Sequence, residues 1–142
     1  MMIKSALKRG GIVAACLLLA LTGCDSGPKR YSISGKVTFK DKPVPAGALR
    51  FIPSEPTIMT SGGAIITDGK YSIPSEQGLL AGSYKVAVSM PDPNVKVVDE
   101  ETPGSGPVAK EMIPEKYNSD TKTVLTIVVK PEGPFEFPFD LK

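Results

Sequence analysis

The feature that most constrains the fold is a series of short segments in which apolar and polar residues alternate, with glycine- and proline-rich turns between them. The clearest segment is 31–40, where Ile33, Val37 and Phe39 share one parity and polar residues take the other. A period of two places the apolar side chains on one face of a half-buried β-strand. By the same reasoning, we expect strands at residues 31–40, 48–52, 63–67, 70–73, 83–90, 123–129 and 135–141.

The turns between these segments favour the same architecture. Asp68-Gly69 separates two of them, and Asp-Gly is a strong hairpin signal because both central turn positions need a positive φ. Pro138 lacks the N–H that a ladder requires, so the last segment is predicted to lie at a sheet edge or to contain a bulge. Short strands without a convincing helix after residue 30 predict an all-β domain, an antiparallel seven-stranded β-sandwich over 31–142.

Residues 91–112 have a different character. Four prolines, the acidic cluster Asp99-Glu100-Glu101 and the small residues 104–106 fall within this stretch. Loops of this length are uncommon in compact domains unless they are functional or disordered, so a long flexible loop is expected here. Two alternatives remain open, namely a binding loop and a short edge strand formed by Val95, Val97 and Val98.

The beginning of the chain reads as a secretory signal. A basic start is followed by an apolar run over 12–21 and by the small residues that precede Cys24. The run is too short for a spanning helix, which needs about 20 apolar residues. Residues 1–23 are therefore expected to form a helical signal peptide, and 24–30 a short tether.

The tetrapeptide Leu21-Thr22-Gly23-Cys24 resembles a bacterial lipobox. The resemblance implies that the Cys24 thiol receives a diacylglyceryl group and becomes the mature N-terminus, which attaches the protein to a membrane on its periplasmic or outer side. The other cysteine, Cys16, would leave with the signal, so no disulfide is expected. Lipidation also accounts for a single leftover cysteine in a secreted chain.

The formal charge of +2 does not describe the mature part. Three of the 17 basic residues but none of the 15 acidic residues lie in the signal, which leaves 14 basic against 15 acidic. Proteins that bind nucleic acid usually show a basic surplus. A nucleic-acid partner is therefore not expected.

Three blocks of sequence resemble the carboxypeptidase regulatory-like domains. These are Ser34-Gly35-Lys36-Val37-Thr38-Phe39 with the turn at 42–47, Thr67-Asp68-Gly69-Lys70-Tyr71-Ser72-Ile73, and Leu80-Ala81-Gly82-Ser83-Tyr84-Lys85-Val86. The segment 113–118 and the terminal strands resemble those of small planctomycete-type lipoproteins of this family. The resemblance implies a transthyretin-like (prealbumin-like) sandwich and no peptidase activity, because its motifs are turn and core residues.

Catalytic chemistry is not expected. The chain has no histidine, which excludes Ser-His-Asp and Cys-His catalysis and the common zinc sites. No glycine-rich loop opens a helix, so no phosphate site is predicted. The carboxylates in the predicted loops show no pairing and no calcium-loop spacing; they are Glu76, Asp92, Asp99, Glu100, Glu101 and Glu115. We therefore predict neither enzymatic activity, nor a cofactor, nor a metal.

Two further sets of residues suggest sites. Lys36 and Asp140, on the first and last predicted strands, suggest an intramolecular isopeptide bond, but both have the parity opposite to the apolar row and should face solvent. Four tyrosines suggest either an aromatic platform for sugar or a structural role; they are Tyr31, Tyr71, Tyr84 and Tyr117. We expect Tyr84 in the core and Tyr71 and Tyr117 as a half-buried rim.

These observations predict a lipid-anchored protein of the cell envelope with a non-catalytic binding or structural role, acting on an envelope protein or polysaccharide. The alternative is a carbohydrate- or polymer-binding module that uses loops at one end of the sandwich, where binding sites on rigid scaffolds usually form.

Overall fold

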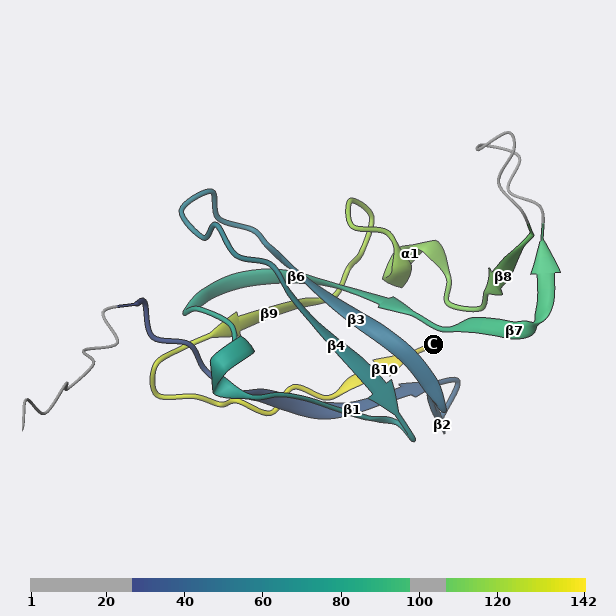
Figure 1. Ribbon diagram of the computed structural model, residues 1–142, viewed down its shortest axis with the longest axis horizontal. Coiled ribbons are helices and arrows are strands. Elements are labelled where there is room, and N and C mark those ends of the chain that lie inside the picture. Colours follow the sequence, from purple (N-terminus) through teal and green to yellow (C-terminus); the bar gives the residue numbers. More distant parts are fainter. Residues whose placement is uncertain (1–26, 98–106) are drawn as a thin grey trace, which may run out of the picture.

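The structure is a computed structural model that describes residues 27–97 and 107–142. The predicted signal peptide and the residues Leu21, Thr22, Gly23 and Cys24 lie outside the described residues. The described part is an all-β domain built on one curled, mostly antiparallel sheet with a small two-stranded ribbon attached (Figure 1). The strands are β1 Ile33–Phe39, β2 Lys42–Pro43, β3 Ala46–Pro53, β4 Gly62–Thr67, β5 Lys70–Ile73, β6 Gly82–Ser89, β7 Pro91–Val97, β8 Val108–Glu111, β9 Thr126–Val129 and β10 Phe139–Leu141.

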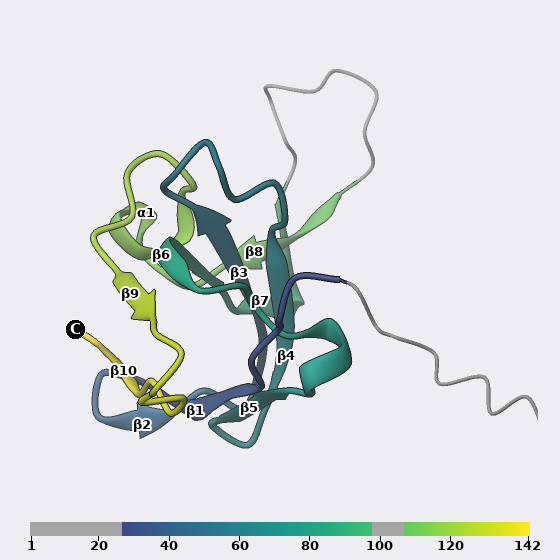
Figure 2. The same cartoon turned by 90° about the vertical axis from the view of Figure 1, so that its left-hand side faces the viewer.

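The large sheet has the strand order β10-β1-β5-β4-β3-β6-β9, and β2 pairs with β1. Between β4 and β5 the only paired residues are Thr67 and Lys70, and there the sheet curls. Figure 2 shows β10, β1 and β5 below β3, β6 and β9. The apolar side chains of both parts meet inside the curl and form the core.

The alternating pattern predicts the core correctly. Ile33 and Val37 on β1 and Leu49 and Phe51 on β3 are all fully buried. On β6 the same holds for Tyr84, Val86 and Val88, whereas Ser83 and Lys85 are only half-buried. Ala87, of the outward parity, is also buried but does not belong to the core cluster, and helix α1 (Glu115–Asn118) packs against β6. A period of two therefore translates directly into side chains that face the interior and side chains that face outward.

The hairpin predicted at Asp68-Gly69 is confirmed. Both residues have a positive φ, 49° and 73°. The turn is also held from outside, because the Gly69 N–H donates to the Val44 carbonyl at 2.7 Å and the Asp68 N–H to that of Pro45 at 2.9 Å. The hairpin thus connects β4 to β5 and locks the segment between β2 and β3 against the turn.

The C-terminal strand corrects the prediction of an entirely antiparallel sheet. β10 runs parallel to β1, with Val37 beside Phe139 and Phe39 beside Leu141. Following the pairings through the sheet, β9 runs opposite to β1, so the turn after β9 reverses the chain into the direction of β1. Pro138 directly precedes β10, which is an edge strand as predicted.

The segment expected as one long loop is partly a β-ribbon. β7 pairs with β8 in antiparallel register, from Pro91 opposite Glu111 to Val97 opposite Val108. The Met112 N–H bonds to the Met90 carbonyl, so in the alternating antiparallel pattern the neighbouring Pro91 is a position whose missing N–H points away from β8. A proline there costs no ladder hydrogen bond, which is why the proline-rich sequence still forms a strand.

Three strands were not among the seven predicted, namely β2, β7 and β8, so the described residues contain ten. Of these, β7 includes Val95 and Val97 of the short edge strand that the sequence left open, and Val98 lies outside the described residues. Two short helical turns were also not predicted. They are a 3₁₀ turn at Ser75–Gln77 and helix α1 at Glu115–Asn118. Both are single turns without a side-chain N-cap, and such turns carry too little periodicity to be found in a sequence.

Candidate functional site

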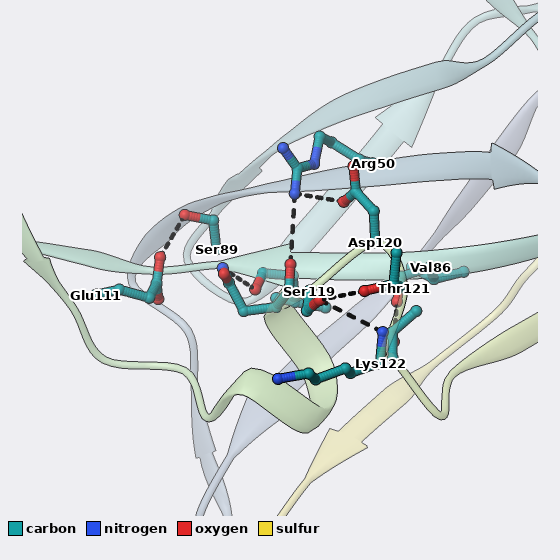
Figure 3. A network of polar contacts seen from close by, with 11 residues as sticks. Arg50, Val86, Ser89, Glu111, Ser119, Asp120, Thr121 and Lys122 are labelled. Atoms are coloured by element: carbon teal, nitrogen blue, oxygen red, sulfur yellow. Dashed lines mark hydrogen bonds and ion pairs between the residues drawn. The ribbon is translucent and has the colours of Figure 1, made fainter. Parts of the chain in front are cut away.

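A small polar pocket of about 330 Å³ lies on the outer face of β3 and β6. It is lined by Ala48, Arg50, Ala87, Val88, Ser89, Glu111 and Asn118. Helix α1 and the residues after it pack over β6 here, and Figure 3 shows Arg50, Ser89 and Glu111 around this surface. Several hydrogen-bonding side chains from different segments meet in this polar pocket, which makes it the candidate site.

The Glu111 carboxylate joins three segments of the chain. Its Oε1 accepts hydrogen bonds from the Met90 N–H at 2.9 Å and the Ile113 N–H at 2.8 Å, and its Oε2 accepts one from the Ser89 hydroxyl at 2.6 Å. Hydrogen bonds to a charged acceptor are stronger than neutral ones. Glu111 therefore fastens the end of β8 and the approach to α1 onto the end of β6.

Arg50 and Asn118 hold the segment after α1 in place. The Arg50 guanidinium lies 2.5 Å from Asp120 Oδ1 and 3.3 Å from the Asn118 carbonyl, and the Asn118 amide donates to the Val88 carbonyl at 3.0 Å. The Arg50–Asp120 pair is exposed, so its contribution to stability is small. The Asn118 contact, made to a strand carbonyl, positions the segment more firmly.

Thr123 completes the ladder between β6 and the chain that leads into β9. Its hydroxyl donates to the Val86 carbonyl at 2.5 Å and accepts from the Leu125 N–H at 3.2 Å. The Val86 N–H bonds directly to the Leu125 carbonyl at 2.9 Å. One buried hydroxyl thus replaces a direct backbone bond and explains why a regular strand begins only at Thr126 rather than at the predicted residue 123.

The carboxylate of the polar pocket is used within the protein, because Glu111 accepts from two N–H groups and a hydroxyl. A ligand could replace these partners only by displacing contacts that hold β8 and the approach to α1. Arg50 differs, because its contacts to Asp120 and the Asn118 carbonyl both use Nη2 and its side chain is exposed. The arrangement therefore serves to fasten the outer segments to the sheet, and the contact between the Ser89 hydroxyl and the Glu111 carboxylate is part of that fastening.

Replacing Glu111 with alanine should lower the free energy of unfolding by about 2 kcal/mol, because two half-buried N–H groups lose their acceptor. Urea denaturation gives this value, and hydrogen exchange should accelerate at the Met90 and Ile113 amides. Glu111→Gln keeps one acceptor oxygen and should lose less. The matched control is Glu115→Ala, which removes an exposed pair with Lys122 and should change stability by less than about 0.5 kcal/mol. Equal effects of the two alanine variants would contradict the role given to Glu111.

The tyrosines do not form an exposed platform. Tyr84 lies in the core as predicted, and its hydroxyl donates to the Leu80 carbonyl at 3.1 Å. The prediction of a half-buried rim is wrong for Tyr71 and Tyr117, which are only 4% and 8% exposed. Tyr31 is half-buried and stacks on Phe135 with a centroid distance of 5.3 Å. The burial of Tyr71 and Tyr117 could not be predicted from nearby residues, because the C-terminal chain covers both side chains.

Two of these tyrosines bond to the C-terminal chain. The Tyr71 hydroxyl donates to the Phe137 carbonyl at 2.8 Å, and that of Tyr117 contacts the Lys142 carbonyl at 3.3 Å. Burial, with a smaller contribution from Glu136, raises the pKa of Tyr71 well above its usual range. Its hydroxyl therefore stays protonated and remains a donor at neutral pH.

Lys36 and Asp140 both face solvent, as their parity predicts. The register places Thr38, not Lys36, beside Asp140, and the Thr38 hydroxyl donates to the carboxylate at 2.8 Å. That hydrogen bond, together with Lys142 at 3.3 Å, lowers the pKa of Asp140. An exposed carboxylate with these partners is not arranged for an isopeptide bond.

The described carboxylates of the predicted loops lie on separate segments. Glu76 is on the 3₁₀ turn, Asp92 accepts from the Asn94 N–H at 2.9 Å on β7, and Glu115 pairs with Lys122 at the start of α1. Asp99, Glu100 and Glu101 lie outside the described residues. Within residues 27–97 and 107–142, acidic side chains nowhere gather in a group of three suited to a metal ion.

Comparison with known proteins leaves the candidate site without a precedent. No family model matches the chain, and no curated protein or solved structure is significantly similar to it. In the described part of the chain, the helical segments fall short of the length and hydrophobicity needed to span a membrane.

Proposed function

We propose that this protein is anchored by lipid to a membrane of the cell envelope and that its β-domain has a non-catalytic binding or structural role. The observation that carries the proposal is the position of Leu21-Thr22-Gly23-Cys24, between an apolar run and a folded domain. A cysteine at this point is the acceptor that lipid attachment requires. Two or three acyl chains, each stabilised by about 0.8 kcal/mol per buried methylene, would make the attachment effectively permanent.

The start of the domain suits such an anchor. Arg30 donates to the Gly78 carbonyl at 3.0 Å, and Tyr31 exchanges backbone hydrogen bonds with Leu79 at 2.8 and 3.1 Å. The chain is therefore held by the domain from Arg30 onward. Five residues separate Cys24 from Arg30, and this stretch of chain reaches at most about 20 Å, so the domain would sit close to the bilayer.

We further propose that the curled sheet is a transthyretin-like sandwich of the carboxypeptidase regulatory-like kind. The three blocks of sequence that resemble that family correspond to β1 with its following turn, to the β4–β5 hairpin and to the start of β6. These segments contribute core residues and the tight turn and do not form a binding site. We therefore expect the domain to act through its surface, with an envelope protein as its partner.

A sugar-binding role through aromatic stacking is not favoured. Three of the four tyrosines are buried, and the exposed large apolar side chains of the described residues are aliphatic or methionine. A glycan-binding face usually offers an exposed aromatic ring to the sugar, whereas the least buried rings of the described residues are only half-buried, namely Tyr31, Phe39, Phe135 and Phe137.

The decisive experiment replaces Cys24 with serine in the full chain. The wild-type protein should partition with the membrane, gain the mass of its acyl groups and require a lipoprotein signal peptidase that globomycin inhibits. Cys24→Ser removes the acceptor sulfur and should leave either released protein or an uncleaved precursor without added lipid. Cys16→Ser is the matched control, because Cys16 lies within the signal and should be dispensable. Unchanged lipid mass and globomycin sensitivity in Cys24→Ser would sink the assignment.

A further inference from the structure

We propose that the end of the domain next to the tether rests on the lipid bilayer, with the Met59 side chain inserted among the lipids. The inference rests on the lipid anchor proposed above and adds an orientation and a contact residue. The surface concerned is called the tether end and comprises the loops 54–61, 74–81 and 130–134 together with residues 27–31.

These segments lie together although they are far apart in the sequence. Tyr31 pairs with Leu79, and Gly82, which begins β6, pairs with Val129 at the end of β9. Ile58 packs directly over Gly82, so closely that a Cβ on this glycine would overlap its side chain. Figure 1 shows the β3–β4 loop, the 3₁₀ turn and the turn after β9 at the same end as the purple start of the domain.

Met59 is displayed on a loop that is held in place. Its side chain is 92% exposed, the highest value among the exposed large apolar residues, whereas the adjacent Ile58 is 9% exposed. The Ile58 N–H bonds to the Glu55 carbonyl at 3.1 Å, and the Glu55 carboxylate accepts from the Ser83 N–H at 3.1 Å. The buried Ile58 side chain thus fixes the loop to the domain, and the next side chain, that of Met59, faces outward.

The tether determines which surface lies close to the Met59 side chain. Because the domain is held from Arg30, Arg30 cannot move more than about 20 Å from the lipidated cysteine, and the tether end is the end of the domain that carries Arg30. Tethering converts a weak contact into an intramolecular one with a high effective concentration. A single apolar residue, too weak to bind a free protein to a bilayer, is then sufficient to orient an anchored one.

The contact is apolar rather than electrostatic. The basic residues at the tether end, Lys29, Arg30 and Lys130, are matched in number by the acidic residues Glu55, Glu76 and Glu132. A balanced surface gives no net attraction to anionic lipid. The occupant of this surface is therefore the bilayer itself, through its apolar region, and the contact should form on uncharged lipid.

The opposite end of the molecule supplies an internal control. Figure 1 places the β7–β8 ribbon far from the start of the domain. Met112 follows β8 there and is 42% exposed, and Val97 on β7 is also partly exposed. In the proposed orientation these residues point away from the membrane.

The first test measures methionine oxidation in the native lipidated chain. Methionine sulfur exposed to water is oxidised by peroxide, and sulfur sequestered from water is protected. If the domain were free of the bilayer, Met59 would react faster than Met112, in line with their exposures. In protein reconstituted into phosphatidylcholine vesicles, we expect the order to reverse, with Met59 several-fold slower than Met112 by peptide mass spectrometry. Faster oxidation of Met59 on vesicles would overturn the proposal.

The second test uses the absence of tryptophan from the chain. Met59→Trp and the matched control Val97→Trp each introduce one tryptophan, so the two variants differ only in where this side chain lies. On vesicles with brominated acyl chains, Met59→Trp should be strongly quenched and blue-shifted, and Val97→Trp should not. Quenching should persist in concentrated salt. Equal quenching of both variants, or loss of quenching in salt, would contradict the apolar contact.

The two proposals fail in different ways. Each sample is first checked for its acyl mass and for partition into detergent, which report on the anchor alone. A chain that carries lipid and stays on the vesicles while Met59 oxidises freely would disprove the orientation and leave the anchor standing. A chain without lipid would disprove the anchor.

Discussion

Replacing Gly35 with alanine is expected to destabilise the domain by about 3 kcal/mol, the upper range for overpacking in a core. Gly35 lies in β1, opposite Tyr71 on β5. A Cβ at this position would overlap the carbonyl oxygen of Phe137 and lie 2.8 Å from the Tyr71 ring. The carbonyl is backbone and is already bonded by the Tyr71 hydroxyl, so relief requires β1 and the C-terminal chain to separate.

Gly63 is the matched control because it is also a strand glycine. The nearest atom to a Cβ there is the Leu49 carbonyl oxygen at 3.4 Å, an ordinary contact. Gly63→Ala should be neutral or stabilise by about 0.5 kcal/mol, since alanine loses less backbone freedom on folding. Urea midpoints of the two variants provide the comparison. A Gly35→Ala protein as stable as Gly63→Ala would show that the C-terminal chain does not pack closely on β1.

Truncating Phe51 to alanine should cost about 4 kcal/mol, within the usual range for a fully buried phenylalanine. Phe51 is completely buried in β3, opposite Gly62 of β4 and Val86 of β6. Its ring also meets Tyr71 across the curl, with centroids 6.1 Å apart. The truncation therefore removes contacts to three strands at once, and a thermal melt should show a large fall in Tm.

Ile65 provides the control for Phe51 because it is also an apolar strand residue but is 71% exposed. Ile65→Ala should change the free energy of unfolding by less than about 0.5 kcal/mol. A similar loss for both substitutions would mean that the core is not centred where β3, β4 and β6 meet. Far-UV circular dichroism confirms that each variant retains its strands before the comparison is made.

The strands of the core could be predicted from the sequence because their signal is local. Residues 31–40 and 83–90 alternate with a period of two, and the core side chains of β1 and β6 follow that period. Asp68-Gly69 predicts its own turn, since the positive φ values it needs are intrinsic to those residue types. Pro138 likewise predicts an edge, because a missing donor is a property of the residue itself.

The features that were missed depend on partners distant in the chain. Pro91 and Pro93 suggest a loop, yet β7 forms because its partner β8 and the Glu111 carboxylate hold it. Tyr71 is buried by the C-terminal chain, 66 residues away, to which its hydroxyl bonds. Nothing in the sequence around either position indicates which segment will cover it.

The sequence alone therefore determined the fold class, the inward face of each main strand, the tight hairpin and the cysteine on which the proposed anchor depends. These properties follow from side-chain periodicity and from the conformational limits of glycine, aspartate and proline. Only the tertiary structure decided that β10 runs parallel to β1, that a ribbon forms within 91–112 and that Met59 stands at the tether end. Each of these features depends on contacts between segments that are far apart in the sequence, and no local sequence pattern specifies such contacts.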